Sequence, residues 1–170
     1  THGGVPQNRE RVFIVGFRND IDPTSFSWPK EIPVEKSLRG ILEKSGVPKK
    51  YYYTAAKYDC YSQIKRSVKS KHTAYQWRRT YVRENKSGVC PALTANMGSG
   101  GHNVPLILVD DGIRKLTPLE CARLQGFDKY NFKIPSDLAD SSLYHQFGNS
   151  VTVPLIQRIA EQIALCLKNQ

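Results

Sequence analysis

The sequence predicts a mixed α/β fold with one strand of a larger sheet, a mixed middle section, a hairpin and two helices. Three features indicate this architecture: a β-branched apolar run near the start, an Asp-Gly turn between apolar runs, and an amphipathic helix at the end. The chain has 170 residues, of which 39% are hydrophobic and 24% charged, as in a globular domain rather than a disordered chain. It contains no run of 18 apolar residues, so we expect no membrane partner.

The first predicted element is a buried strand at residues 11–17. The run R-V-F-I-V-G-F is apolar and β-branched, with a proline upstream and Asn19-Asp20 after it. A single buried strand cannot form a sheet, so we expect it to be the last strand of a sheet whose other strands lie outside this sequence. The chain opens with Thr1 rather than Met, which suggests a processed or trimmed chain or a fragment.

The next stretch is predicted to be a connector followed by a short helix. Three prolines within residues 20–33 indicate an irregular segment. An amphipathic helix is predicted over residues 34–44, with Leu38, Ile41 and Leu42 facing inward.

The middle third of the chain is basic and aromatic. Between residues 30 and 90 there are 15 Lys and Arg against 5 Asp and Glu, a balance of +10 that equals the net charge of the whole chain. Such a block suggests a polyanionic partner, and it favours nucleic acid over a membrane. The alternative is a solvated, lysine-rich surface without a partner. Residues 49–83 hold seven of the nine tyrosines, most of which we expect to form a core, and a short helix is predicted near 58–69.

A hairpin is predicted in the second half of the chain. The apolar runs 104–109 and 112–116 flank the sequence D-D-G at 110–112, and Asp-Gly between apolar runs is a strong hairpin signal. The sequence G-S-G-G at 98–101 predicts a flexible turn before it.

Two helices are predicted to follow the hairpin. Thr117 as N-cap, Pro118 at the first helical position and Glu120 at the third form a capping box, and Gly126 ends that helix. The last helix is predicted over 153–167, and its apolar stripe is interpreted as core. The stripe consists of Leu155, Ile156, Ile159, Ile163 and Leu167.

The cysteines do not indicate a metal site. None of the four lies in a C-x-x-C pair or a zinc-like Cys/His cluster, so we expect a reduced, cytosolic protein without metal. They are Cys60, Cys90, Cys121 and Cys166.

Three sequence motifs occur in a fixed order. Residues 4–12 read G-V-P-Q-N-R-E-R-V, residues 114–127 read R-K-L-T-P-L-E-C-A-R-L-Q-G-F, and residues 146–151 read Q-F-G-N-S-V. Together they resemble the C-terminal half of the DNA (cytosine-5) methyltransferases. The resemblance implies the terminal strand and helices of a Rossmann-like, S-adenosylmethionine-dependent methyltransferase sheet, plus a small, mainly β target-recognition domain.

The resemblance also implies a division of the chain. Residues 1–32 would hold the last strand region of the catalytic domain, and residues 33–113 the target-recognition domain. Residues 114–145 would be the linking helix and loop of the recognition domain, and 146–170 the final motif and the helix that returns to the catalytic domain. The expected partners are double-stranded DNA and the N-terminal catalytic half, in the same chain or a separate subunit.

The first motif is expected to touch the flipped cytosine. By resemblance, Arg11 holds the cytosine O2 and polarises the ring, and an arginine suits this role because it stays charged and offers directed donors. Arg9 holds backbone phosphate or orders the loop, and Gln7 supports that loop. Strand periodicity places both arginines on one face.

The other site residues are also expected from the resemblance. Asn149, Ser150 and Val151 are expected to bind S-adenosylmethionine, because short polar side chains and free N–H groups at a helix start suit its carboxylate. Thr94 is expected to contact the phosphate beside the flipped base. Further candidates for DNA contact are Gln76, Arg78, Arg79, Arg83 and Asn96.

The nucleophile of the family is not found in this sequence. The catalytic cysteine lies in an upstream Pro-Cys motif, whereas Cys90-Pro91 has the reverse order. The expected activity is therefore that of a partial methyltransferase, inactive alone, located in the bacterial cytoplasm at the nucleoid. The alternatives are a non-catalytic, sequence-specific DNA-binding subunit and an enzyme that methylates RNA.

Overall fold

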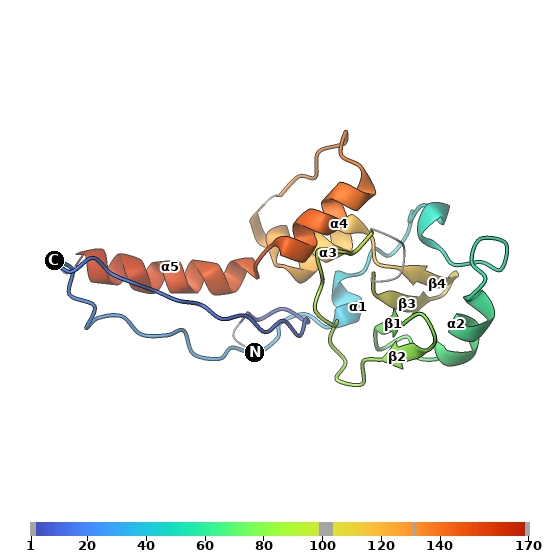
Figure 1. The fold of residues 1–170 in the computed structure, drawn as a ribbon, viewed down its shortest axis with the longest axis horizontal. Helices are drawn as coiled ribbons and strands as arrows, with labels where there is room; N and C mark the ends of the chain where they lie inside the picture. The colour runs from blue at the N-terminus through green and yellow to red at the C-terminus, as the bar shows by residue number, and fades with distance from the viewer. Residues whose placement is uncertain (1–2, 99–103, 131, 169–170) are drawn as a thin grey trace.

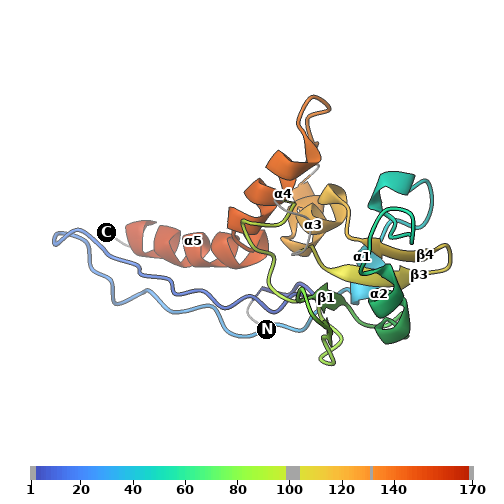
Figure 2. The same ribbon diagram turned by 45° about the vertical axis from the view of Figure 1, so that its right-hand side comes forward.

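The computed structural model describes residues 3–98, 104–130 and 132–168. Figure 1 shows an elongated molecule, with the long helix α5 (Val153–Lys168) at one end and all strands and shorter helices at the other. The N-terminal segment runs out along α5 and returns beside it, an arrangement that both views show (Figures 1 and 2). Ser99, Gly100 and Gly101 of the predicted flexible turn lie outside the described residues.

The prediction of a buried strand at residues 11–17 is wrong. The segment is extended but forms no strand, and Val12 and Ile14 are 88% and 93% exposed. A strand needs a neighbour that takes up its N–H and C=O groups, and no segment of the described chain pairs with this run.

Helix α5 confirms the predicted last helix but only part of the predicted core. Of the predicted stripe, Ile159 is buried, Leu155, Ile156 and Ile163 are half-buried, and Leu167 is 52% exposed. Hydrogen bonds attach the helix to the N-terminal segment. Arg158 donates to the Lys30 carbonyl at 2.7 Å, and the Ser27 hydroxyl donates to the Gln162 side chain at 2.9 Å.

An antiparallel sheet forms the centre of the compact end, with strand order β2-β1-β3-β4. Strands β3 (Leu106–Val109) and β4 (Gly112–Lys115) form the predicted hairpin, with Gly112 opposite Val109 at φ 129°. Strands β1 (Tyr75–Trp77) and β2 (Val82–Glu84) lie in the basic region, where the resemblance implied a mainly β domain but the sequence pattern located no strand.

The helices before the sheet are shorter than predicted. Helix α1 spans Leu38–Ile41, with both terminal side chains buried, and helix α2 spans Tyr61–Ser67. A 3₁₀ turn, η1, lies between them at Lys49–Tyr51. Tyr51, Tyr53 and Tyr75 are buried, and Tyr52, Tyr58 and Tyr61 are half-buried, so most of the tyrosines pack as predicted.

Three further elements follow the sheet. Helix α3 (Pro118–Leu124) has the predicted capping box, and Gly126 follows it at φ 84°. A 3₁₀ turn, η2, spans Phe127–Tyr130. Helix α4 (Asp140–Asn149) was not predicted. Only three of its residues bury an apolar side chain, too few to give a clear helical pattern in the sequence. No helix in the described ranges has the length and hydropathy of a membrane span.

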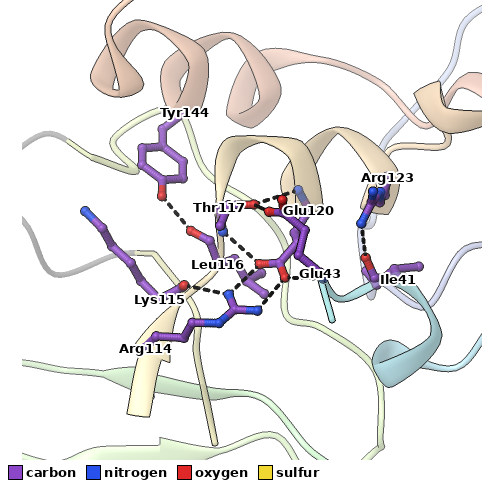
Figure 3. Close-up of polar contacts among 9 residues, drawn as sticks. All are labelled: Ile41, Glu43, Arg114, Lys115, Leu116, Thr117, Glu120, Arg123 and Tyr144. Carbon is purple, nitrogen blue, oxygen red and sulfur yellow. Dashed lines mark hydrogen bonds and ion pairs between the residues drawn. The ribbon is translucent and has the colours of Figure 1, made fainter. Parts of the chain in front are cut away.

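A buried ion pair joins the hairpin to α3 (Figure 3). The two terminal nitrogens of the Arg114 guanidinium donate to the Glu120 carboxylate, at 2.7 and 2.6 Å, and both side chains are almost inaccessible. Burial lowers the pKa of Arg114, but the hydrogen bonds and charge of Glu120 raise it to a net value above the ordinary one. The same carboxylate accepts from the N–H groups of Thr117 and Glu43, each at 2.8 Å, so one side chain connects β4, α3 and the segment after α1.

Candidate DNA-binding cleft and final motif

Gln7 holds the first loop against the compact end. The side chain is buried, its amide donates to the Leu124 carbonyl at 3.0 Å, and its oxygen accepts from the Leu93 N–H at 3.4 Å. The backbone beside it pairs with Cys90, which donates to the Pro6 carbonyl at 2.7 Å. The residue therefore connects the end of α3 to the loop 91–98.

Arg9 is directed into the protein. One terminal nitrogen donates to the Leu93 carbonyl at 2.6 Å, and the other to the carbonyls of Gly148 and Ser150 at 2.8 and 2.6 Å. Burial and the neighbouring Arg11 lower the pKa of Arg9. Of the two roles expected for it, this geometry favours ordering of the loop over binding of a phosphate.

Arg11 is exposed and lies between two clefts. Its only hydrogen bond with the described residues is a donation to the Glu10 carbonyl at 2.6 Å. Arg9 and Arg11 both line the first, more apolar cleft, but so do their neighbours Asn8 and Glu10. Because no strand forms here, the expectation of a shared face stays a prediction.

The second cleft, here called the basic cleft, brings together six of the predicted site residues. It has a volume of about 550 Å³ and is formed by the first loop, the β1–β2 hairpin and the loop 91–98. Its lining consists of Asn8, Glu10, Arg11, Gln76, Arg78, Arg83, Asn85, Pro91, Ala92, Thr94 and Asn96. Within the described chain Arg78 and Arg83 form no ion pair, so positive charge is concentrated here.

The β1–β2 hairpin supplies one wall of the basic cleft. Gln76 and Arg83 are cross-strand partners on the outer face, because the alternate residues Tyr75 and Trp77 are buried. Arg79 lies at the tip, outside the cleft lining, with φ 65° in the left-handed region that a non-glycine residue rarely adopts.

The loop 91–98 supplies another wall and packs on α4. Thr94 and Asn96 are exposed on it, and Met97 donates to the Thr94 carbonyl at 3.0 Å to form a turn. The contact with the helix depends on Gly148, since a Cβ atom there would lie 2.1 Å from the Thr94 carbonyl oxygen.

The final motif forms the break between α4 and α5. Asn149 is the last residue of α4, and its amide contacts the His145 ring at 3.0 Å. The Ser150 hydroxyl donates to the Phe147 carbonyl at 2.9 Å, and the Val151 side chain is exposed. None of these three residues lines the cleft that Arg9 and Arg11 share. Within the described chain, Arg9 connects this cleft to the motif by donating to the carbonyls of Gly148 and Ser150.

Donors for a carboxylate lie at this break. The first N–H of α5, on Val153, donates to the Gln125 carbonyl at 2.8 Å. The preceding N–H groups, on Val151 and Thr152, have no hydrogen-bond partner in the described part of the chain. Such N–H groups fit the carboxylate of S-adenosylmethionine, and the side-chain carbonyl oxygen of Asn149 fits its ammonium group.

Cysteine chemistry is not supported at Cys90 or Cys121. Both side chains are fully buried, and burial raises the pKa of both thiols. Cys90 lies under the basic cleft rather than in it. The described residues contain no cluster of three or more metal-ligating side chains.

Sequence reasoning missed several residues that shape this site. Asn8 and Glu10 line the basic cleft, and His145 contacts the loop 91–98. The first two alternate with the arginines, so strand periodicity alone placed them on the opposite face. His145 lay in a helix that was not predicted, and no pattern pointed to it.

Comparison with known proteins places the chain in a family. A family model described as C-5 cytosine-specific DNA methylase matches residues 1–165. The chain is 51% identical over 162 residues to the type II methyltransferase M.Bsp6I of Bacillus sp. (strain RFL6), covering 95% of this chain and 51% of that protein. It is 35% identical over 183 residues to M.HpaII of Haemophilus parainfluenzae, covering 98% and 49%. The chain thus spans about half the length of these relatives.

Solved structures share the fold at low sequence identity. The Dnmt2 methyltransferase of S. pombe has a TM-score of 0.57 at 18% identity, covering 98% of this chain and 53% of that one. The methyltransferase EhMeth of Entamoeba histolytica has a TM-score of 0.53 at 18% identity, covering 94% and 49%. With the family match over nearly its whole length, this chain belongs to the C-5 cytosine-specific DNA methylases.

Proposed function

We propose that this chain is the C-terminal part of a DNA (cytosine-5) methyltransferase that acts on a cytosine flipped out of duplex DNA. The chain supplies target recognition, the arginine contact to the cytosine and part of the cofactor site, and the N-terminal half supplies the nucleophilic cysteine. The observation that carries the proposal is the basic cleft, which joins Arg11 to the predicted DNA-contacting residues of two other segments. Family membership and the half-length match to the relatives support it.

Arg11 is the residue proposed to contact the target base. Only one of its N–H groups is used within the described chain, so the others remain to bind the cytosine O2. A guanidinium stays charged, and it stabilises the negative charge that develops on the ring when a thiolate attacks. Gln7 and Arg9 hold the loop that carries it.

The walls of the basic cleft are proposed to divide the contacts with DNA. Thr94 and Asn96 hold the phosphate beside the flipped base, and Arg78 adds charge within the cleft. Arg79 adds charge from the hairpin tip, outside the cleft lining. Gln76 and Arg83 have side chains suited to adenine and guanine edges in the major groove.

S-adenosylmethionine is the proposed cofactor and supplies the methyl group. Asn149, Ser150 and Val151 hold its amino-acid end, with the N–H groups of Val151 and Thr152 as donors for the carboxylate. We place the complete enzyme in the bacterial cytoplasm at the nucleoid, in keeping with its DNA substrate and bacterial relatives.

A chimera tests the proposal directly. The matching C-terminal half of M.Bsp6I is replaced by this chain, and incorporation of labelled methyl groups into duplex DNA is measured. We expect cytosine C5 methylation by the chimera and none by either half alone. Arg11→Ala should lower the rate by about 100-fold, as for loss of one transition-state donor. Arg18→Ala, an exposed arginine paired with Asp20, is the matched control and should leave the rate unchanged.

The same experiment distinguishes the alternatives. Salt-sensitive DNA binding with no methylation by the folded chimera favours a non-catalytic DNA-binding subunit, which the basic cleft would also suit. Methylation of tRNA in preference to duplex DNA in a competition assay favours an RNA methyltransferase. Either result overturns the proposed reaction.

A further inference from the structure

His145 connects the final motif to the loop that lines the basic cleft. Its Nδ1 atom lies 2.9 Å from the Ala95 carbonyl oxygen, and its Nε2 atom lies 3.0 Å from the amide nitrogen of Asn149. Ala95 lies between Thr94 and Asn96, the two proposed phosphate contacts, and Asn149 belongs to the proposed cofactor site. One side chain therefore touches both functional segments.

In the neutral ring, the two contacts select one tautomer. A carbonyl oxygen can only accept, so Nδ1 carries the hydrogen that is donated to Ala95. In the neutral ring Nε2 then has a lone pair, which accepts from the NH₂ group of Asn149. Both ring nitrogens then have a partner. The side-chain carbonyl oxygen of Asn149 has none among the described residues, so it can accept from a ligand.

Both peptide carbonyls that flank Thr94 are held by this arrangement. The Leu93 carbonyl accepts from Arg9 at 2.6 Å, and the Ala95 carbonyl accepts from His145. Arg9 also holds the carbonyls of Gly148 and Ser150, next to Asn149 in the chain. If the final motif shifts when a ligand binds, Arg9 and His145 shift with it, and the backbone on both sides of Thr94 moves as well.

We propose that His145 is a positioning residue that couples the cofactor-facing Asn149 to the DNA-contacting loop. This inference rests on the proposed function. Because coupling is reciprocal, a ligand at Asn149 tightens DNA binding by the same factor as DNA tightens binding of that ligand. The expected coupling is about tenfold, within the usual range for linked sites.

The test uses the M.Bsp6I chimera and measures the dissociation constant of a target duplex with and without S-adenosylhomocysteine. In the parent chimera we expect DNA binding about tenfold tighter with the ligand. His145→Phe, which removes both hydrogen bonds, should bring the ratio close to one. Ser142→Ala, an exposed position on α4, is the control and should keep the ratio of the parent.

A second variant separates coupling from folding. His145→Asn keeps a donor near the Nδ1 position for Ala95 but cannot reach Asn149, so the loop stays supported while the connection is lost. A ratio near one with an unchanged melting temperature supports the proposal. An unchanged ratio in this variant, or no coupling in an active parent chimera, overturns it. A parent chimera that does not methylate DNA instead contradicts the proposed function.

Discussion

At the scale of single residues, Gly148 shows why the final motif cannot vary freely. The loop 91–98 rests on α4 so closely that any side chain at this position would meet the Thr94 carbonyl. Neither group can move cheaply, since the loop is held by Arg9 and the helix is held by its own packed residues. The glycine thus serves the loop 91–98, which is proposed to contact DNA, although it belongs to the motif expected to serve the cofactor.

Gly148→Ala should therefore both destabilise the protein and weaken DNA binding. The introduced Cβ would lie 2.1 Å from the Thr94 oxygen, and overpacking of this kind costs about 1–3 kcal/mol. Thermal unfolding and the dissociation constant of a target duplex measure the two effects. Gly40→Ala is the control, since its new Cβ would meet nothing closer than 3.6 Å. Equal melting temperatures for the two variants would contradict the packing argument.

The thiols should differ in their reactivity. Cys90 and Cys121 are fully buried, and burial raises their pKa, whereas Cys60 is half-buried on the surface with a smaller increase from the same cause. Alkylation at neutral pH should modify Cys60 in the native protein, and Cys90 and Cys121 only after unfolding. Mass spectrometry of timed samples measures this, with Cys60→Ser as the control. Rapid native modification of Cys90 would contradict its placement under the cleft.

At the scale of elements, the sequence predicted those with a local chemical signal. The capping box of Thr117 and Glu120 and the Asp-Gly turn act within a few residues, so α3 and the β3–β4 hairpin could be located in advance. Strands β1 and β2 span three residues each, too few for a pattern, and form because Tyr75 and Trp77 pack on the other strands. Likewise Arg9 donates to carbonyl groups that lie 84 or more positions away in the sequence, so these hydrogen bonds depend on tertiary folding.

The buried ion pair of Arg114 and Glu120 is expected to determine how the elements of the compact end are joined. Glu120→Gln leaves the Arg114 charge buried without its counter-charge, so the loss of stability should be about 3–5 kcal/mol. Asp110→Asn, which removes the exposed partner of Lys71, should cost far less, because water screens an exposed pair. Denaturant unfolding of the two variants measures the difference. Similar losses would show that burial of the first pair has no energetic consequence.

At the scale of the whole molecule, one segment serves both the basic cleft and an exposed apolar surface. The N-terminal segment carries Arg11 in the lining of the basic cleft. Just beyond it Val12 and Ile14 are exposed, as are Leu165 and Leu167 near the end of α5, which runs beside this segment (Figure 1). Exposed apolar side chains of this kind in neighbouring segments are typical of a surface that a partner covers. The failed prediction of a buried strand has the same cause, because its apolar pattern matches a sheet that no described segment supplies.

We therefore expect the N-terminal half of the methylase to cover this apolar surface and to complete the strand. Ile14→Asp should weaken the association of the two separately expressed halves by about 10- to 100-fold, because burying an isoleucine contributes about 1.5–3 kcal/mol. Tyr81→Asp changes an exposed apolar side chain on the compact end and is the matched control, with no expected effect on association. Calorimetric titration of one half with the other measures both constants. If the two variants associate equally well, the surface that joins the halves lies elsewhere on the chain.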